Sequence, residues 1–193
     1  METDAPYTHT TLIQGLATAE RAVSEFFGSL SADEFERREG SAWTPAEHLE
    51  HLNTAVKAVA EGFELPPWLL RFRFGRPRRS SRTYEQLRDD YRALLEEGAG
   101  ATGRFVPGRG GFGEDDSMVR RTRLLSRWYR ANERLRSALE RWTERDLDRV
   151  QLPHPILGRI TAREMVLFTI YHNHHHIAAA GRRVRPADED GAG

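Results

Sequence analysis

Apolar side chains recur every three or four residues over four long stretches of the chain, and this spacing predicts helices that each bury one face. The first stretch spans about residues 8–30. Ser31 and Glu34 then form a capping-box pattern, which predicts a short helix around Phe35. No alternating run of apolar and polar residues is long enough for a convincing strand, so the pattern predicts an all-α fold. The stripe of the first helix consists of Leu12, Ile13, Leu16, Ala19, Val23, Phe26, Phe27 and Leu30.

Signals for helix ends delimit the three other long helices. The second begins at Thr44–Glu47, a capping box with proline at the first helical position, and the Pro66–Pro67 pair is expected to end it. The third is predicted over residues 116–142, after an acidic pair that suits a helix N-terminus. The fourth begins at another capping box, residues 161–164, and Gly181 is expected to cap its end.

A long connection, residues 64–115, separates the second and third predicted helices. It contains six arginines in the twelve positions 71–82, one predicted helix at 84–97, and a Gly-rich segment at 98–113 that we expect to be mobile. A crossover of this length lets the helices on either side of it run parallel. We therefore predict a four-helix bundle with a long crossover between its second and third helices.

Length and composition indicate a single domain and exclude several classes of function. The 193 residues suit one domain, which we assign to residues 1–186, followed by a disordered tail at 187–193. The 29 basic and 29 acidic residues cancel, which disfavours a general nucleic-acid binder. The chain has no cysteine, which excludes disulfides, thiolate ligands and a protein thiol nucleophile. No apolar run could span a membrane and no secretory signal precedes the first helix, so we expect a cytoplasmic protein.

Four of the eight histidines occupy the five residues from His172 to His176. Residues four apart face the same side of a helix, so His172 and His176 could bind one metal ion. A metalloprotease with this spacing needs a glutamate after the first histidine as its base, and Asn173 holds that position. The spacing therefore favours a metal site outside that protease class. The alternative is a set of core or solvated histidines with no ligand.

A third ligand must come from another helix. On the second helix, His51 lies at or near the predicted inner face, and His48 is its rival. In the cluster, His175 is three residues after His172 and could replace His176, although the helix face favours His176. Zinc or nickel are the metals we expect most, with iron or manganese as further candidates.

The remaining candidates have weaker signals. His174 points away from His172 and His176, and His9 and His154 are expected on the surface or in loops. Asn132 interrupts the stripe of the third helix, either as a hydrogen-bond partner of the site or as a polar residue at the edge of the stripe.

The Arg-rich segment 71–82 alternates with aromatic residues and could contact an anionic ligand or a nucleic acid. We favour instead a solvated loop that acidic residues of the next predicted helix neutralise in part. The aromatic residues are Trp68, Phe72 and Phe74, and the acidic residues are Glu85, Asp89 and Asp90.

Two longer motifs resemble the DinB/YfiT-like superfamily. Residues 43–52, Trp-Thr-Pro-Ala-Glu-His-Leu-Glu-His-Leu, look like the start of its second helix. Residues 154–164 followed by 171–177, Tyr-His-Asn-His-His-His-Ile, look like its last helix. The resemblance extends over about residues 8–182. It implies a four-helix bundle, often dimeric, with a divalent metal held by His51, His172 and His176.

The resemblance also suggests a function. Relatives include transferases that use bacillithiol or mycothiol, maleylpyruvate isomerases, iron-binding domains of sulfoxide synthases, and proteins described only as metal-dependent hydrolases. We therefore expect a metal-dependent enzyme that acts on a small molecule, with thiol S-transfer ahead of hydrolysis and a low-molecular-weight thiol as co-substrate. We also expect a homodimer without nucleic-acid or membrane partners. The competing hypothesis is a stress-related helical binding protein whose metal is structural or incidental.

Overall fold

Four long helices form the body of the protein in the computed structural model, which describes residues 7–108 and 114–184. They are α1 (His9–Ser29), α3 (Pro45–Glu64), α6 (Glu114–Leu139) and α8 (Ala162–Val184). Each of the four packs against two of the others. The prediction of an all-α bundle is therefore confirmed.

The starts of the long helices follow from their capping residues. The Thr44 hydroxyl accepts the Glu47 amide, and the Glu47 carboxylate accepts the Thr44 amide. Thr161 and Glu164 form the same reciprocal pair at the start of α8. A cap of this kind stabilises a helix by about 1 kcal/mol. These pairs set the first residue of α3 and of α8. They therefore also set how far along each helix the histidines lie.

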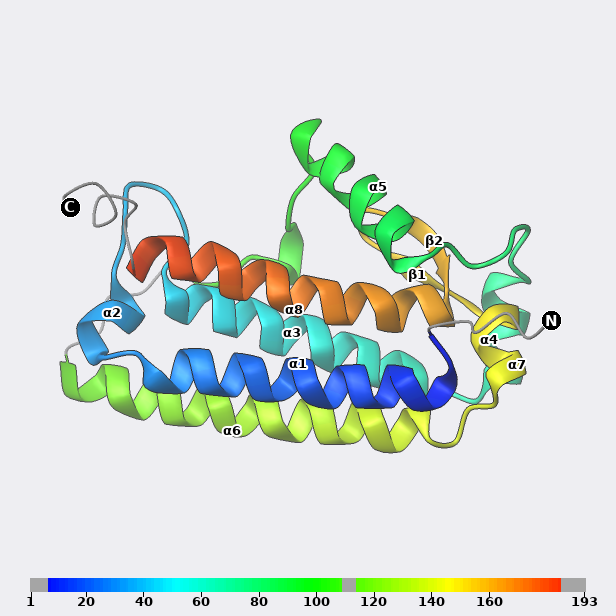
Figure 1. Cartoon of the computed structure of the whole chain (residues 1–193), viewed down its shortest axis with the longest axis horizontal. Helices are drawn as coiled ribbons and strands as arrows, with labels where there is room; N and C mark the ends of the chain where they lie inside the picture. The colour runs from blue at the N-terminus through cyan, green and yellow to red at the C-terminus, as the bar shows by residue number, and fades with distance from the viewer. Residues whose placement is uncertain (1–6, 109–113, 185–193) are drawn as a thin grey trace, which may run out of the picture.

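The long connection between α3 and α6 allows these two helices to run in the same direction. In Figure 1, α3 and α6 run from left to right, whereas α1 and α8 run from right to left. The second and third long helices are thus parallel, as the crossover predicted. The centre of the bundle is filled by fully buried side chains that include Phe27, Phe63 and Trp128.

Two helix ends differ from the prediction. The third long helix stops at Leu139, and a separate short helix, α7 (Glu144–Arg149), begins after its own cap at Thr143. The last helix does not stop at Gly181 but continues to Val184. Gly181 therefore lies within the last helix and does not cap it. A Cβ at this position would lie 3.8 Å from the Phe26 ring, an ordinary van der Waals contact.

A short hairpin contradicts the expectation that the chain has no strand. Strands β1 (Gln151–His154) and β2 (Gly158–Thr161) pair antiparallel, with Leu152 opposite Ile160. Each strand has only four residues, and β1 contains a proline, so no period-two pattern could develop. Both Leu152 and Ile160 are buried, so packing against the bundle stabilises the hairpin.

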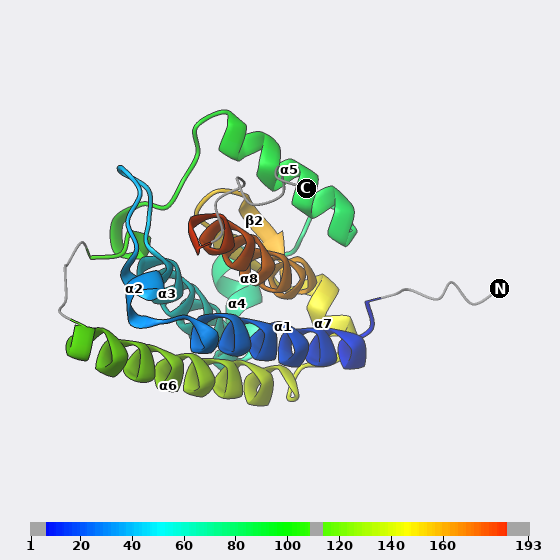
Figure 2. The same cartoon turned by 60° about the vertical axis from the view of Figure 1, so that its left-hand side comes forward.

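The connection between α3 and α6 is more structured than predicted. Helix α5 (Tyr84–Glu96) is present as expected, and a 3-10 turn, η1 (Gly103–Phe105), lies within the Gly-rich segment. An additional helix, α4 (Pro67–Phe74), begins at the second proline of the pair that ends α3, because proline suits a first helical turn. Figures 1 and 2 show α5 lying against α8 outside the bundle. Residues 109–113 of the predicted mobile segment, and the predicted tail at 187–193, lie outside the described residues.

Two arginines of the Arg-rich segment are structural. Arg79 and Arg82 donate to the buried carboxylate of Glu164, at 2.5 and 2.9 Å. Burial opposes ionisation of Glu164, but these bonds and the amides of Arg82 and Thr161 lower its pKa. Arg82 also pairs with Asp90, as the loop interpretation expected. The segment thus ties the connection to the start of α8 instead of remaining fully solvated. None of the helices in the described ranges has the length and apolarity needed to cross a membrane.

Candidate metal centre

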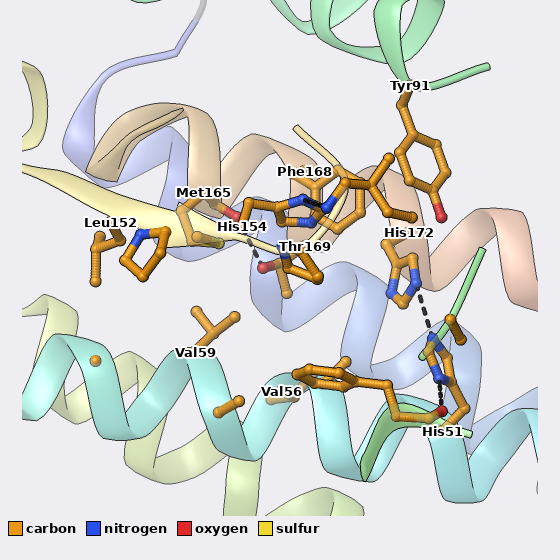
Figure 3. Close-up of a pocket in the computed structure, with 18 of the residues that line it drawn as sticks. His51, Val56, Val59, Tyr91, Leu152, His154, Met165, Phe168, Thr169 and His172 are labelled. Carbon is orange, nitrogen blue, oxygen red and sulfur yellow. Dashed lines mark hydrogen bonds between the residues drawn. The ribbon is translucent and has the colours of Figure 1, made fainter. Parts of the chain in front are cut away.

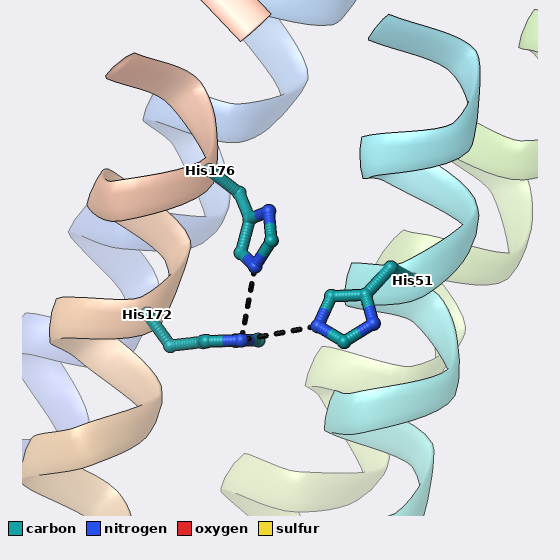
Figure 4. A group of neighbouring side chains, drawn as sticks. All are labelled: His51, His172 and His176. Atoms are coloured by element: carbon teal, nitrogen blue, oxygen red, sulfur yellow. Dashed lines mark hydrogen bonds between the residues drawn. The ribbon is translucent and has the colours of Figure 1, made fainter. Parts of the chain in front are cut away.

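Three buried histidines from two helices converge at one point. His172 and His176 lie one turn apart on α8, and His51 faces them from α3 (Figure 4). The His172 Nε2 lies 3.1 Å from the His51 Nε2 and 3.0 Å from the His176 Nε2. One ligand atom of each ring lies within 4.8 Å of the others. The structure therefore brings together the three residues proposed as ligands.

The main chain fixes which nitrogen of His51 is free. The His51 Nδ1 lies 2.7 Å from the carbonyl oxygen of Phe105, in the 3-10 turn. A carbonyl can only accept, so Nδ1 carries the proton and Nε2 presents its lone pair to the other two rings. A carbonyl that orients a ligating imidazole in this way is typical of metal sites. The Gly-rich segment thus reaches the site through a backbone group that the sequence pattern did not reveal.

His48 supports the site from outside the triad. Its Nδ1 lies 2.7 Å from the Nδ1 of His176, whose Nε2 faces the centre. The indole of Trp43 stacks on the His176 ring, with centroids 6.1 Å apart and planes 13° apart. Of the two candidates for the third ligand on α3, His51 therefore lies in the converging group and His48 lies behind His176.

Burial keeps the cluster neutral. It lowers the pKa of His172 and of His176 well below the ordinary value, and the neighbouring histidines add to the effect. Burial also lowers the pKa of His51, although its bond to Phe105 opposes the shift. Neutral imidazole is the form that binds a cation, so few protons compete for these nitrogens at neutral pH.

A cavity of about 610 Å³ opens beside the three histidines. Figure 3 shows His51 and His172 at one end of it, and Leu152 of the hairpin at the other. Val56 and Val59 of α3 form one wall, and α8 forms the opposite wall. This volume is typical of sites for small molecules. The α8 wall contains Met165, Phe168 and Thr169.

His154 lies in this cavity, which corrects the expectation of a loop or surface residue. It ends strand β1, is only 9% exposed, and packs edge-on against Phe168 with ring centroids 4.3 Å apart. Burial, with a contribution from Arg82, lowers its pKa to about 4. The sequence could not reveal this position because the burial of His154 depends on the unpredicted hairpin.

Tyr91 is a second cavity residue that the sequence reasoning missed. It comes from α5, is 5% exposed, and lies with its ring centroid 6.4 Å from that of His172. Burial raises its pKa to about 12, so the phenol keeps its proton at neutral pH. The sequence predicted the helix that carries Tyr91, but no pattern linked this residue to the histidines.

The other candidates lie outside the converging group. His174 is exposed, as expected, and His175 lines the cavity without joining the three nitrogens. His9 is half-buried at the start of α1, with its Nε2 2.8 Å from the Leu139 carbonyl oxygen. Asn132 is buried, but its amide donates to Trp128 within α6. The structure thus supports neither interpretation of Asn132, as a partner of the site or as a residue at the stripe's edge.

The donor set fits a divalent metal ion. Three neutral imidazoles suit zinc, copper, iron and nickel, whereas magnesium and calcium prefer oxygen ligands. Three protein ligands also leave coordination positions open, as in catalytic rather than structural zinc sites. The three buried histidines could therefore hold a divalent metal ion beside the cavity that they line.

The comparisons with known proteins agree with this geometry. A family model for the DinB superfamily matches residues 16–180, which include all four long helices in whole or in part. Neither the curated proteins nor the solved structures give a significant match. The family match spans most of the chain and contains His51, His172 and His176. The chain belongs to the DinB superfamily.

Proposed function

We propose that the protein is a metal-dependent enzyme that acts on a small molecule, by thiol S-transfer in preference to hydrolysis. One observation carries the proposal: three neutral, buried imidazoles converge beside a cavity of about 610 Å³. A purely structural metal would have no need of such a cavity. His51, His172 and His176 hold the metal in this proposal.

A divalent metal bound here would polarise a substrate or lower the pKa of a coordinated thiol or water. The chain's own residues prepare the site for that chemistry. Phe105 holds His51 in the ligating tautomer, and Trp43 stacks on the face of the His176 ring. The lining of the cavity is mainly apolar, and electrostatic interactions are stronger in such surroundings than in water.

The composition supports an external nucleophile. The chain has no cysteine, so any sulfur that is transferred must arrive on a separate thiol. In S-transfer that sulfur bonds to an electrophilic carbon of the substrate, while the thiol proton and the leaving group depart. In hydrolysis a water oxygen takes the place of the sulfur. Both reactions use the same open side of the metal site.

Turnover assays on metal-loaded protein test the proposal. The purified protein is loaded with zinc or nickel and given monobromobimane with bacillithiol, mycothiol or cysteine. In parallel, 4-nitrophenyl acetate without thiol reports hydrolysis. We expect metal-dependent S-transfer that His51→Ala abolishes and His174→Ala leaves intact. Stoichiometric metal without turnover of either substrate would favour the non-catalytic binding protein.

The assembly and location of the protein remain part of the proposal. We expect a homodimer in the cytoplasm, with no nucleic-acid or membrane partner. Light scattering on the purified full-length protein distinguishes a dimer of 22.1 kDa chains from a monomer.

A further inference from the structure

One histidine of the cavity, His154, has a role that the metal does not explain. It lies on the hairpin, not among the three converging nitrogens, and is 9% exposed. A buried polar side chain normally has a partner for each polar atom, because an unmet donor costs about 1–3 kcal/mol. The hydrogen bonds of His154 therefore show what the cavity offers to a ligand.

The turn after β1 settles the tautomer of His154. The backbone amides of Ile156 and Leu157 both donate to its Nδ1, at 3.2 and 3.0 Å. A nitrogen that accepts two amide protons carries no proton of its own. The ring is therefore neutral with its single proton on Nε2, and it can only donate from that atom.

The Nε2–H of His154 has no acceptor among the described residues. Its surroundings in the cavity are apolar, with Leu152, Met165 and Phe168 nearby in Figure 3. Thr169 lies on the same wall and its hydroxyl donates to the Met165 carbonyl at 2.8 Å, but it makes no hydrogen bond with His154. The cavity thus presents a fixed, neutral donor within apolar walls, away from the metal ligands.

We propose that the cavity takes an apolar small molecule with a hydrogen-bond acceptor oxygen, such as a ketone, ester or amide carbonyl, and that this oxygen accepts the His154 Nε2–H. The inference rests on the proposed function in one respect: the reacting end of the molecule lies at the three histidines. His154 is then a specificity-determining residue, which selects and positions the substrate without touching the reacting atoms.

A matched pair of probes tests the donor. The ketone 2-acetylnaphthalene and the hydrocarbon 2-ethylnaphthalene have nearly the same shape and differ in the carbonyl oxygen. Their affinities for the zinc-loaded full-length protein are measured by displacement of a fluorescent anilinonaphthalene dye. The His154→Phe variant keeps the ring volume but lacks the donor, so we expect the ketone to lose about five-fold in affinity and the hydrocarbon to be unchanged.

A second variant provides the control. His174→Phe makes the same exchange at an exposed histidine outside the cavity lining, and should leave the ratio of the two affinities unchanged. An unchanged ratio in His154→Phe, a ratio that changes equally in His174→Phe, or a failure of both probes to bind would overturn the proposal. The ratio of the ketone and hydrocarbon affinities should be the same after the metal is removed by chelation. A protein that fails to bind metal would therefore disprove the proposed function, whereas the proposal about His154 is decided by this ratio alone.

Nuclear magnetic resonance of the wild-type protein tests the proposal without any variant, so the test does not require a variant to fold. In ¹⁵N-labelled protein, the His154 ring should show a protonated Nε2 and a bare Nδ1. The ketone should shift the Nε2–H proton downfield, and the hydrocarbon should not. A proton on Nδ1, or equal shifts with both probes, contradicts the assignment.

Discussion

His51 and His154 are both buried imidazoles that line one cavity, and the main chain orients both of them. At His51 a carbonyl accepts from Nδ1, so Nε2 is left with a lone pair. At His154 two amides donate to Nδ1, so Nε2 is left with a proton. The same side chain is therefore a ligand in one place and a donor in the other.

The difference shows that residue type alone does not define a histidine's chemistry. The backbone group behind the ring decides it, and that group comes from a loop distant in sequence or from the following turn. Phe105 is 54 residues from His51, whereas Leu157 is three residues from His154. Each prediction below tests one side of this contrast.

Removal of a ligand should have the largest effect. His172→Ala deletes the ring that contacts both other histidines, so metal affinity should fall by more than the roughly 10- to 100-fold that loss of a supporting partner costs. His174→Ala, on the exposed face of the same helix, should keep full metal content. Metal analysis after gel filtration measures both. Equal metal in the two variants would contradict the ligand assignment.

Acid should lower both the free energy of unfolding and the affinity for metal. The folded-state pKa is lowered at His154, to about 4, and at His51, His172 and His176, so below about pH 6.5 the unfolded chain binds more protons than the folded one. Stability is complete above that pH and falls as pH decreases. Each such group costs up to about 1.4 kcal/mol per pH unit. Bound metal should be retained at about pH 7.5 and released below about pH 6.

Urea unfolding of the chelated protein at several pH values, together with metal analysis, measures this effect. Well below the ligand pKa values, the fall in apparent metal affinity should approach three protons per metal, one for each histidine. A slope of one proton would indicate a single histidine ligand. An unfolding free energy that stays constant between about pH 7.5 and 5 would contradict the buried neutral cluster.

The stability of the region where the hairpin meets α8 should depend on the charge of Glu164. Glu164→Gln preserves the shape of the capping side chain but leaves Arg79 and Arg82 without their buried carboxylate. Removal of one partner from a buried pair is strongly destabilising, and we expect a loss of about 3 kcal/mol in the free energy of unfolding. Asp89→Asn, at an exposed pair, should cause no measurable change. Metal affinity should be the same in both variants, since Glu164 contacts none of the three histidines.

The orientation of His51 should respond to strain in the 3-10 turn. Gly103 has a φ of 55°, so Gly103→Ala strains the turn by about 1–2 kcal/mol and shifts the Phe105 carbonyl. We expect metal affinity to fall by up to about ten-fold, less than for loss of a ligand. Gly98→Ala introduces similar strain at a φ of 95°, away from this carbonyl, and should leave metal affinity unchanged. Zinc titration against a competing chelator measures both, and equal losses would show that the carbonyl is not responsible.

The sequence predicted the bundle because its signals are local. Capping residues such as Thr44 and Glu47 act within one turn, and the four-residue spacing of His172 and His176 places them on one face. His51 was predictable as a candidate for the same reason, since it lies on a buried stripe. These features need no knowledge of the tertiary structure.

Other features of the site depend on contacts that no local pattern encodes. His154 is buried only because a hairpin of four-residue strands packs against α8. The Phe105 carbonyl is a backbone group, which has no signature in the residue type. The Pro66–Pro67 pair ended one helix as predicted and also began the next, since proline suits both positions.

X-ray absorption spectroscopy at the metal edge of the zinc-loaded protein tests the central claim most directly. We predict one zinc per chain with three imidazole nitrogens at about 2.0–2.1 Å and at least one light atom from solvent. Added thiol should replace that light atom with sulfur and leave the imidazole contribution unchanged. A shell without imidazole scattering, or one saturated by four protein ligands that thiol cannot enter, would contradict a three-histidine site open to the cavity.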